Sequence, residues 1–121
     1  WGTLFANMEK EDALAYVKLG YHLGIGGSIL QPEAKAGVLG EAVRAIPLDK
    51  ILIETDAPFI LPWCKDVIPS KILRKTCNTS LILPEVIRKI AELKGISPEE
   101  VETATTANTI RLFALHGIAD T

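Results

Sequence analysis

The residues best suited to chemistry in this 121-residue chain follow a short apolar run near its middle. Residues 51–53 read Ile-Leu-Ile, and Glu54, Thr55 and Asp56 come directly after them. An apolar run of this length is typical of a strand buried on both faces of a parallel sheet. The carboxyl edge of such a sheet faces the crevice where ligands bind, and strands hold side chains more firmly than loops do. The pattern therefore marks Asp56 as the first candidate for a metal-binding carboxylate.

Asp56 also has a purely structural interpretation, and Thr55 is expected to have a structural role. Asp56 could instead cap the turn at Ala57 and Pro58. Thr55 points away from Asp56, because successive strand side chains alternate between faces, and we expect it to pack or to hydrogen-bond.

Strands and helices alternate along the first three quarters of the chain. Apolar residues at helical spacing predict helices over residues 8–19, 32–45 and 83–93. Residues 21–25 and 51–53 are predicted strands. The alternation predicts an α/β fold in which parallel strands alternate with helices.

The remaining segments are a long loop and two short helices. Residues 57–79 contain three prolines and no sustained period, which indicates a loop. Ser97, followed by Pro-Glu-Glu, predicts a capped helix over residues 98–104. A separate last helix is predicted over residues 106–113, with Gly117 ending it.

Composition limits the classes of function. Hydrophobic residues make up 48% of the chain and the mean hydropathy is +0.24, which indicates extensive burial or a subunit contact. A net charge of −2 gives no global basic field, so a nucleic-acid substrate would need local cations. The one dense cationic run, residues 71–75, is more often a solvated face than a phosphate site.

Cysteine usage and the lack of targeting signals favour a soluble, cytoplasmic protein. Cys64 and Cys77 have neither a zinc-site spacing nor the numbers of a disulfide framework. No signal peptide opens the chain, and no apolar run approaches the roughly 20 residues of a membrane span. We therefore expect no membrane partner.

Four stretches in order resemble the carboxyl-terminal part of the TatD family of metal-dependent hydrolases. They read YVKLGYHLGIGGSI, IPLDKILIETDAPFILP, AELKGISPEEV and TTANTIRLF. The resemblance implies that residues 1–121 are the carboxyl-terminal portion of a TIM (β/α)8 barrel. It further implies a hydrolase that cleaves phosphodiester bonds, most often as a DNase, with a divalent metal (Mg, Mn or Zn) in the complete enzyme.

The resemblance assigns roles to individual residues. Asp56 falls on the family's strand-eight aspartate, a metal ligand at the barrel mouth and hence a catalytic residue. Glu54 is expected to support the strand end rather than to bind metal. Asn78 matches the asparagine of an Arg-Asn pair after the long loop, where Cys77 replaces the arginine. Arg74 or Lys75 could take over that arginine's contact with a phosphate, or be solvated loop charges.

Departures from the family pattern leave the site incomplete. The family's His-x-His pair, glutamate and later histidines have no counterpart, and an ungapped count places Leu4 or Thr3 where one histidine is expected. His22 and His116 are expected to be structural or solvated. One carboxylate does not make a two-metal hydrolase, so this chain alone is expected to be inactive. Whether it binds any metal by itself stays open.

Three classes of function remain in view. The first is a part of a TatD-like deoxyribonuclease, with DNA or another phosphodiester as substrate and with the missing barrel half, or self-association, completing the fold. The second is a non-catalytic interaction module that keeps the half-barrel as a scaffold. The third, a nucleotide-binding loop at residues 24–27, lacks the spacing of both the dinucleotide and the P-loop motifs.

Overall fold

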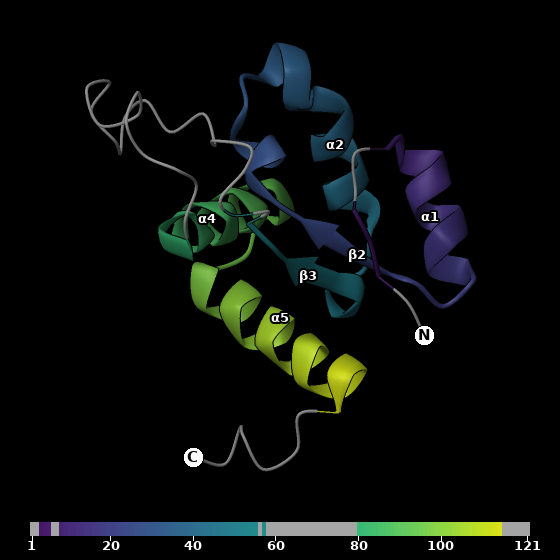
Figure 1. Cartoon of the computed structure of the whole chain (residues 1–121). Coiled ribbons are helices and arrows are strands. Elements are labelled where there is room, and N and C mark those ends of the chain that lie inside the picture. The colour runs from purple at the N-terminus through teal and green to yellow at the C-terminus, as the bar shows by residue number, and fades with distance from the viewer. Residues whose placement is uncertain (1–2, 6–7, 56, 58–79, 115–121) are drawn as a thin grey trace.

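A computed structural model of the chain describes residues 3–5, 8–55, 57 and 80–114 (Figure 1). Residues 3–5 and 33–35 are described by their backbone only. Within these ranges no helix is long and apolar enough to cross a membrane.

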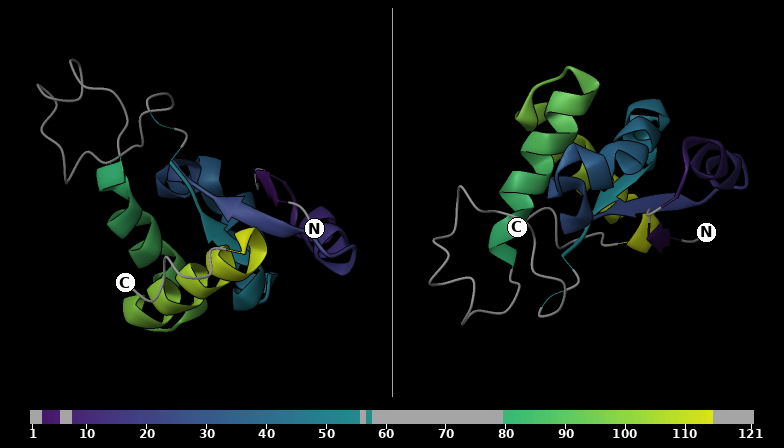
Figure 2. Two further views of the ribbon diagram at one scale, coloured as in Figure 1. Left: turned by 60° about the horizontal axis from the view of Figure 1, so that its bottom comes forward. Right: turned by 90° about the horizontal axis from the view of Figure 1, so that it is seen from above.

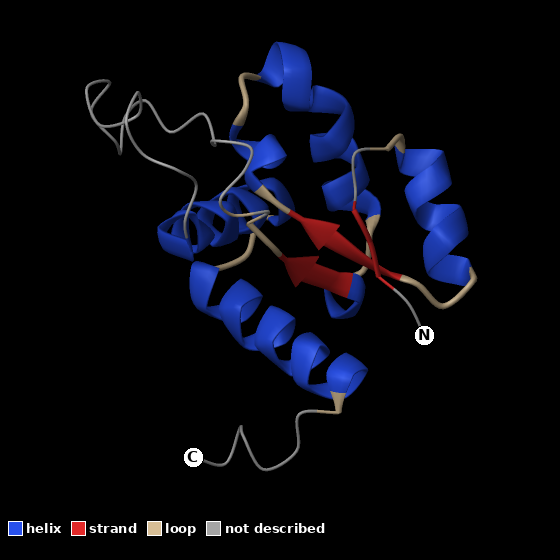
Figure 3. Ribbon diagram, viewed as in Figure 1, coloured by secondary structure: helices blue, strands red, loops and turns tan. Residues whose placement is uncertain are grey.

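The first half of the chain forms a parallel sheet with two crossover helices. Strand β1 (Thr3–Phe5) leads through helix α1 (Lys10–Lys18) to strand β2 (His22–Ile25), and helix α2 (Glu33–Ala45) leads on to strand β3 (Ile51–Ile53). The strands lie in the order β1-β2-β3, and both pairs are parallel. Figure 3 shows the arrowheads of β2 and β3 pointing the same way. The expected alternation of parallel strands and helices is confirmed.

Two further helices and three 3-10 turns complete the described chain. Helix α4 (Leu83–Lys94) and helix α5 (Pro98–Phe113) follow the sheet. The 3-10 turns are η1 (Gly27–Leu30) after β2, η2 (Leu48–Lys50) before β3 and η3 (Ser80–Ile82) before α4. The turn between α4 and α5 has the predicted signals. Gly95 is left-handed (φ 66°), and the Ser97 hydroxyl accepts the Glu100 N–H at 3.2 Å.

The last helix differs from the prediction. One continuous helix, α5, replaces the two short helices predicted over residues 98–104 and 106–113. The Thr-rich middle has weak helix propensity, but burial overrides it: Thr105 is 1% exposed, and its hydroxyl donates to the Val101 carbonyl at 2.8 Å. The helix ends at Ala114 in the left-handed region (φ 52°), not at Gly117, which lies outside the described residues.

Strand β1 was not expected from the sequence. Its three residues are too few to show a period of two, and pairing with β2 defines it: Thr3 lies opposite His22 and Leu4 opposite Leu23. The two positions where a family histidine was looked for therefore lie in a strand next to β2.

The core lies between one face of the sheet and the helices. Leu23 and Ile25 on β2 and Ile51 on β3 are fully buried, and they share a face because strand side chains alternate. Figure 2 shows the helices gathered on one side of the strands. The helices contribute the following buried side chains: Ala13, Leu39, Ala42, Val43, Val86, Ile90, Ala91 and Val101.

The buried amide of Asn108 holds α5 against the beginning of β3. Asn108 is 1% exposed, and its Nδ2 donates to the carbonyls of Leu48, at 2.9 Å, and Ile51, at 2.8 Å. Its Oδ1 accepts from Arg111 Nη2 at 2.6 Å. Both ends of the amide are therefore engaged, as a buried polar group requires.

A second polar contact joins α4 to the end of α2. Lys94 Nζ donates to the carbonyl of Ile46 at 2.5 Å, which supplies a partner to the cap residue of α2. Burial lowers the pKa of Lys94 below its ordinary value. The ammonium group thus bonds a backbone carbonyl at the end of a helix.

We expect Asn108→Ala to destabilise the chain by about 2–4 kcal/mol, because it removes two hydrogen bonds to backbone carbonyls inside the core. Chemical denaturation of the parent and the variant measures this. Thr103→Ala, an exposed change on the same helix, is the control and should stay within about 0.5 kcal/mol. Equal stabilities for the parent and Asn108→Ala would show that the amide does not hold α5 in place.

Candidate functional site

The carboxyl end of β3 continues as an ordered segment beyond the strand. The Glu54 N–H donates to the Ile25 carbonyl at 3.0 Å, so the pairing with β2 extends by one residue. Thr55 Oγ1 accepts the Ala57 N–H at 3.0 Å, which confirms that Thr55 hydrogen-bonds. The Ala57 amide, a donor that a turn-capping Asp56 could have used, is thus bonded to Thr55.

Gly26 makes room for the carboxylate of Glu54. A side-chain carbon at Gly26 would lie 2.9 Å from Glu54 Cδ and 3.3 Å from the Glu54 carbonyl oxygen, and closer still to Oε1. Gly26 is buried, and its backbone is extended (φ −121°), a conformation that any residue can adopt. A glycine is needed here because a side chain would not fit, and not because the backbone conformation demands one. The half-buried carboxylate of Glu54 therefore packs on the backbone that follows β2.

This packing disfavours a phosphate-binding role for the glycines of residues 24–27. A phosphate-binding loop leaves its backbone N–H groups open to the anion. Here a carboxylate already lies against Gly26, and its negative charge would repel a phosphate. The glycine serves the close approach of β3's carboxyl end to β2.

The four residues that the sequence assigns to the site all lie outside the described part of the chain. Asp56, Arg74, Lys75 and Asn78 lie outside the described residues, as do Cys77 and His116. In the described part of the chain, no three His, Cys, Asp or Glu side chains come together as metal ligands would. The described residues by themselves therefore do not fit a divalent metal, and Glu54 is the carboxylate that they contribute at the carboxyl end of β3.

His22 lies at the opposite end of the sheet from Glu54. It is the first residue of β2 and is half-buried, and its Nδ1 is buried without a hydrogen-bond partner among the described residues. Burial foremost, and then the positive charges of Lys50 and Arg111, lower the pKa of His22 below its ordinary value of 6.5. The neutral imidazole is thus favoured, and its position separates it from the candidate carboxylates.

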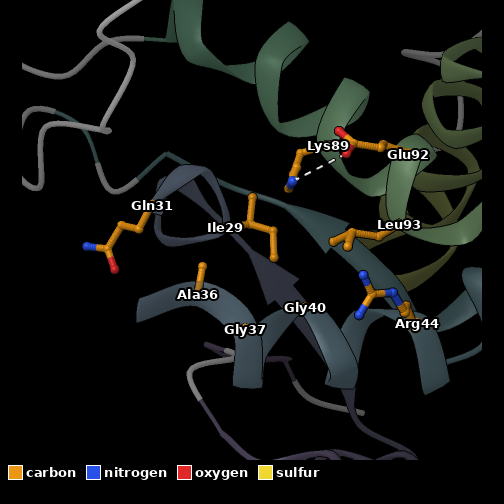
Figure 4. Close-up of a pocket in the computed structure, with 9 residues that line it drawn as sticks. All are labelled: Ile29, Gln31, Ala36, Gly37, Gly40, Arg44, Lys89, Glu92 and Leu93. Carbon is orange, nitrogen blue, oxygen red and sulfur yellow. Dashed lines mark ion pairs between the residues drawn. The ribbon is translucent and has the colours of Figure 1, made fainter. Parts of the chain in front are cut away.

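A hollow of about 120 Å³ lies between α2 and α4 (Figure 4). Apolar side chains, Ile29 and Leu93 among them, line it, and Arg44 and the ion pair of Lys89 with Glu92 (3.6 Å) are its charged members. It lies within the helical layer, and no residue at the carboxyl end of β3 lines it. It is therefore separate from the candidate carboxylates.

Comparison with known protein families identifies the family of this chain. The family described as TatD related DNase matches residues 6–114. The chain belongs to the TatD-related DNase family.

Curated relatives in this family are bacterial exonucleases. The chain is 36% identical over 106 residues to the 3'-5' ssDNA/RNA exonuclease TatD of Citrobacter rodentium, covering 88% of this chain and 38% of the relative. It is 36% identical over 110 residues to the protein of the same name from Erwinia amylovora, covering 91% and 39%. The chain thus spans less than two fifths of the length of these TatD relatives.

Solved structures confirm the fold class. The TatD homologue YjjV from Escherichia coli superposes with a TM-score of 0.73 at 25% identity, over 90% of this chain and 39% of that one. A TatD-family hydrolase from Entamoeba histolytica gives 0.70 at 18% identity, over 90% and 40%. The fold is therefore part of a TIM barrel, as the resemblance implied.

For two residues that shape this TatD-family sheet, the sequence did not predict the role that the structure shows. Asn108 lies within the motif TTANTIRLF, and the signal for it was a polar residue on the apolar face of a helix. Gly26 follows directly after a strand, where a glycine often marks close approach of another chain segment.

We expect Gly26→Ala to displace the Glu54 carboxylate and to cost about 1 kcal/mol, because the new methyl group would overlap it. Denaturation of the two single variants and of Gly26→Ala/Glu54→Ala measures the coupling between the residues. The Gly26→Ala change should lower the free energy of unfolding less in the Glu54→Ala background than in the parent. The coupling energy between the two changes should be at least about 0.5 kcal/mol. Strict additivity would contradict the contact.

We expect the stability of the chain to rise with pH through the window between the lowered pKa of His22 and 6.5. In that window the unfolded state binds more protons than the folded state, so the free energy of unfolding increases with pH. Above 6.5 the contribution of His22 is constant. Denaturation across this range should show a flatter profile for His22→Gln than for the parent. Identical profiles for His22→Gln and the parent would contradict the assignment.

Proposed function

We propose that this chain is the carboxyl-terminal part of a divalent-metal-dependent nuclease of the TatD family. The observation that carries the proposal is the family match over residues 6–114, because that range includes the strand that runs into Glu54 and Asp56. The curated relatives are named as 3'-5' exonucleases of single-stranded DNA and RNA. We take single-stranded nucleic acid as the substrate class of the complete enzyme.

Asp56 is the residue that we assign to the metal. It follows the end of β3 by three residues, at the edge where TIM-barrel enzymes gather their catalytic residues. The neighbouring Thr55 engages the Ala57 amide, and the Glu54 backbone is bonded to β2. These contacts fix the chain on either side of Asp56, which supports a role that needs a well-placed carboxylate.

We assign different roles to the two acids. Glu54 packs against Gly26, and we propose that it supports the strand end. Asp56 would supply a metal ligand, and Asn78 with Arg74 or Lys75 would face the phosphates of the substrate. When bound, the metal would assist hydrolysis of the phosphodiester bond.

A complete site requires residues from beyond these elements. The described residues bring no three potential ligands together, and TIM-barrel sites draw on the ends of several strands. We propose that the rest of a barrel, or a second copy of the chain, completes the fold.

We expect Asp56→Asn to lower magnesium- or manganese-dependent nuclease activity at least about 100-fold in a protein of full family length that contains this chain. Loss of even an outer partner of a metal ligand costs 10–100-fold, and loss of a ligand should cost no less. Hydrolysis of a labelled single-stranded oligonucleotide measures the rate. The matched control is Asp12→Asn, an exposed aspartate on α1, which should keep the parent rate.

Two outcomes would contradict the proposal. Equal rates for Asp56→Asn and the parent would remove Asp56 from the site. Absence of metal-dependent cleavage by the full-length parent would favour the non-catalytic interaction module instead. The chain alone should show no cleavage, and activity there would show that it completes its own site.

A further inference from the structure

An open recess of about 550 Å³ lies at the amino-terminal end of the sheet. It forms where the first residue of β2, the 3-10 turn η2 and the last turn of α5 meet, and the following residues line it: His22, Asp49, Lys50, Arg111 and Leu112. Lys50 precedes β3 and Glu54 follows it, so their backbones are roughly 13 Å apart at the rise of a strand. The recess is therefore distinct from the carboxyl end that carries the proposed nuclease site.

Arg111 is held in place within this recess. Its Nη2 donates to Asn108 Oδ1 at 2.6 Å, and the Asn108 amide is itself fixed by the carbonyls of Leu48 and Ile51. A guanidinium group carries five N–H donors in a rigid fork, so this single bond leaves donors for a ligand. A cation oriented by a buried amide loses less side-chain entropy on binding than a freely moving one does.

Lys50 is the second cation of the recess, and His22 lines it beside the two cations. Within the described part of the chain, neither Lys50 nor Arg111 forms an ion pair. Their charges both lower the pKa of His22, after burial, which shows that their fields overlap at the imidazole. Asp49 is the opposing charge, because its carboxylate raises the pKa of the same imidazole.

We propose that this recess binds a phosphate group, with Arg111 and Lys50 as its principal partners and His22 at its edge. The guanidinium fork matches two oxygens of a phosphate, and the ammonium adds a point charge. Among the described residues that line the recess, two cations outweigh the carboxylate of Asp49, so the recess attracts a doubly charged anion. This assignment does not depend on the proposed nuclease function.

Titration with inorganic phosphate tests the proposal on the chain itself, with the imidazole signals of His22 as the reporter. The chain has two histidines, so His116→Gln assigns the signals. Phosphate should shift the His22 signals saturably and raise the pKa of His22, because a nearby anion favours the charged imidazole. Sodium chloride at the same ionic strength should not. Equal effects of phosphate and chloride would overturn the proposal.

Charge variants locate the binding to this recess. Arg111→Gln and Lys50→Gln should each weaken phosphate binding about 10-fold, the equivalent of about 1.4 kcal/mol, and Asp49→Asn should tighten it. Lys50→Gln leaves the contact of Asn108 with Arg111 intact, so its result stands even if Arg111→Gln disturbs folding. The control is Arg44→Gln, an exposed arginine on α2 that does not line the recess. Equal weakening by Arg44→Gln would reduce the effect to overall charge and overturn the site.

Two ligands distinguish the sources of the phosphate group. A 5'-mononucleotide that shifts His22 more strongly than a short oligonucleotide without a terminal phosphate would identify a small phosphate ester as the ligand. The reverse order would identify the backbone of a nucleic acid. If neither of these ligands nor inorganic phosphate shifts the His22 signals, the proposal is overturned.

Discussion

The buried amide of Asn108 is the contact on which the arrangement of the sheet's last strand depends. It bonds the carbonyl of Leu48 in the turn before β3 and the carbonyl of Ile51 at its first residue, and so fixes α5 to the point where the strand begins. From Ile51 onward the register with β2 is set by pairing with Leu23. An apolar side chain could fill the same space, but it could not specify which carbonyls lie next to the helix.

The two ends of β3 are thus fixed by different means. At the amino end a polar side chain from a distant helix bonds the backbone. At the carboxyl end, Gly26 provides space and the Glu54 carboxylate occupies it. Between them, Ile51 and Ile53 pack with the helical layer. A short strand held at both ends and packed along one face places Glu54, the residue that follows it, against β2.

Local signals in the sequence accounted for much of this fold. The period of residues 83–93, with Gly95 and Ser97 after it, predicted α4 and the start of α5, because those signals act within one turn of helix. These local signals did not predict the parts of the fold that long-range packing determines. The Thr-rich middle of α5 looked like a break, yet burial of Thr105 and Asn108 keeps it helical. In the same way β1 exists through its pairing with β2, which no three-residue pattern could reveal.

The site was less predictable than the fold for a related physical reason. The acidic step after β3 indicated where a ligand would lie, but the roles of its residues depend on what approaches them across the sheet. Gly26 determines the surroundings of Glu54 from another strand, and TIM-barrel sites draw further residues from strands beyond these three. The recess at the amino end is different in kind: its described lining residues all come from β2, η2 and α5. Its chemistry can therefore be tested on this chain alone, whereas that of Asp56 requires the barrel of which the chain forms a part.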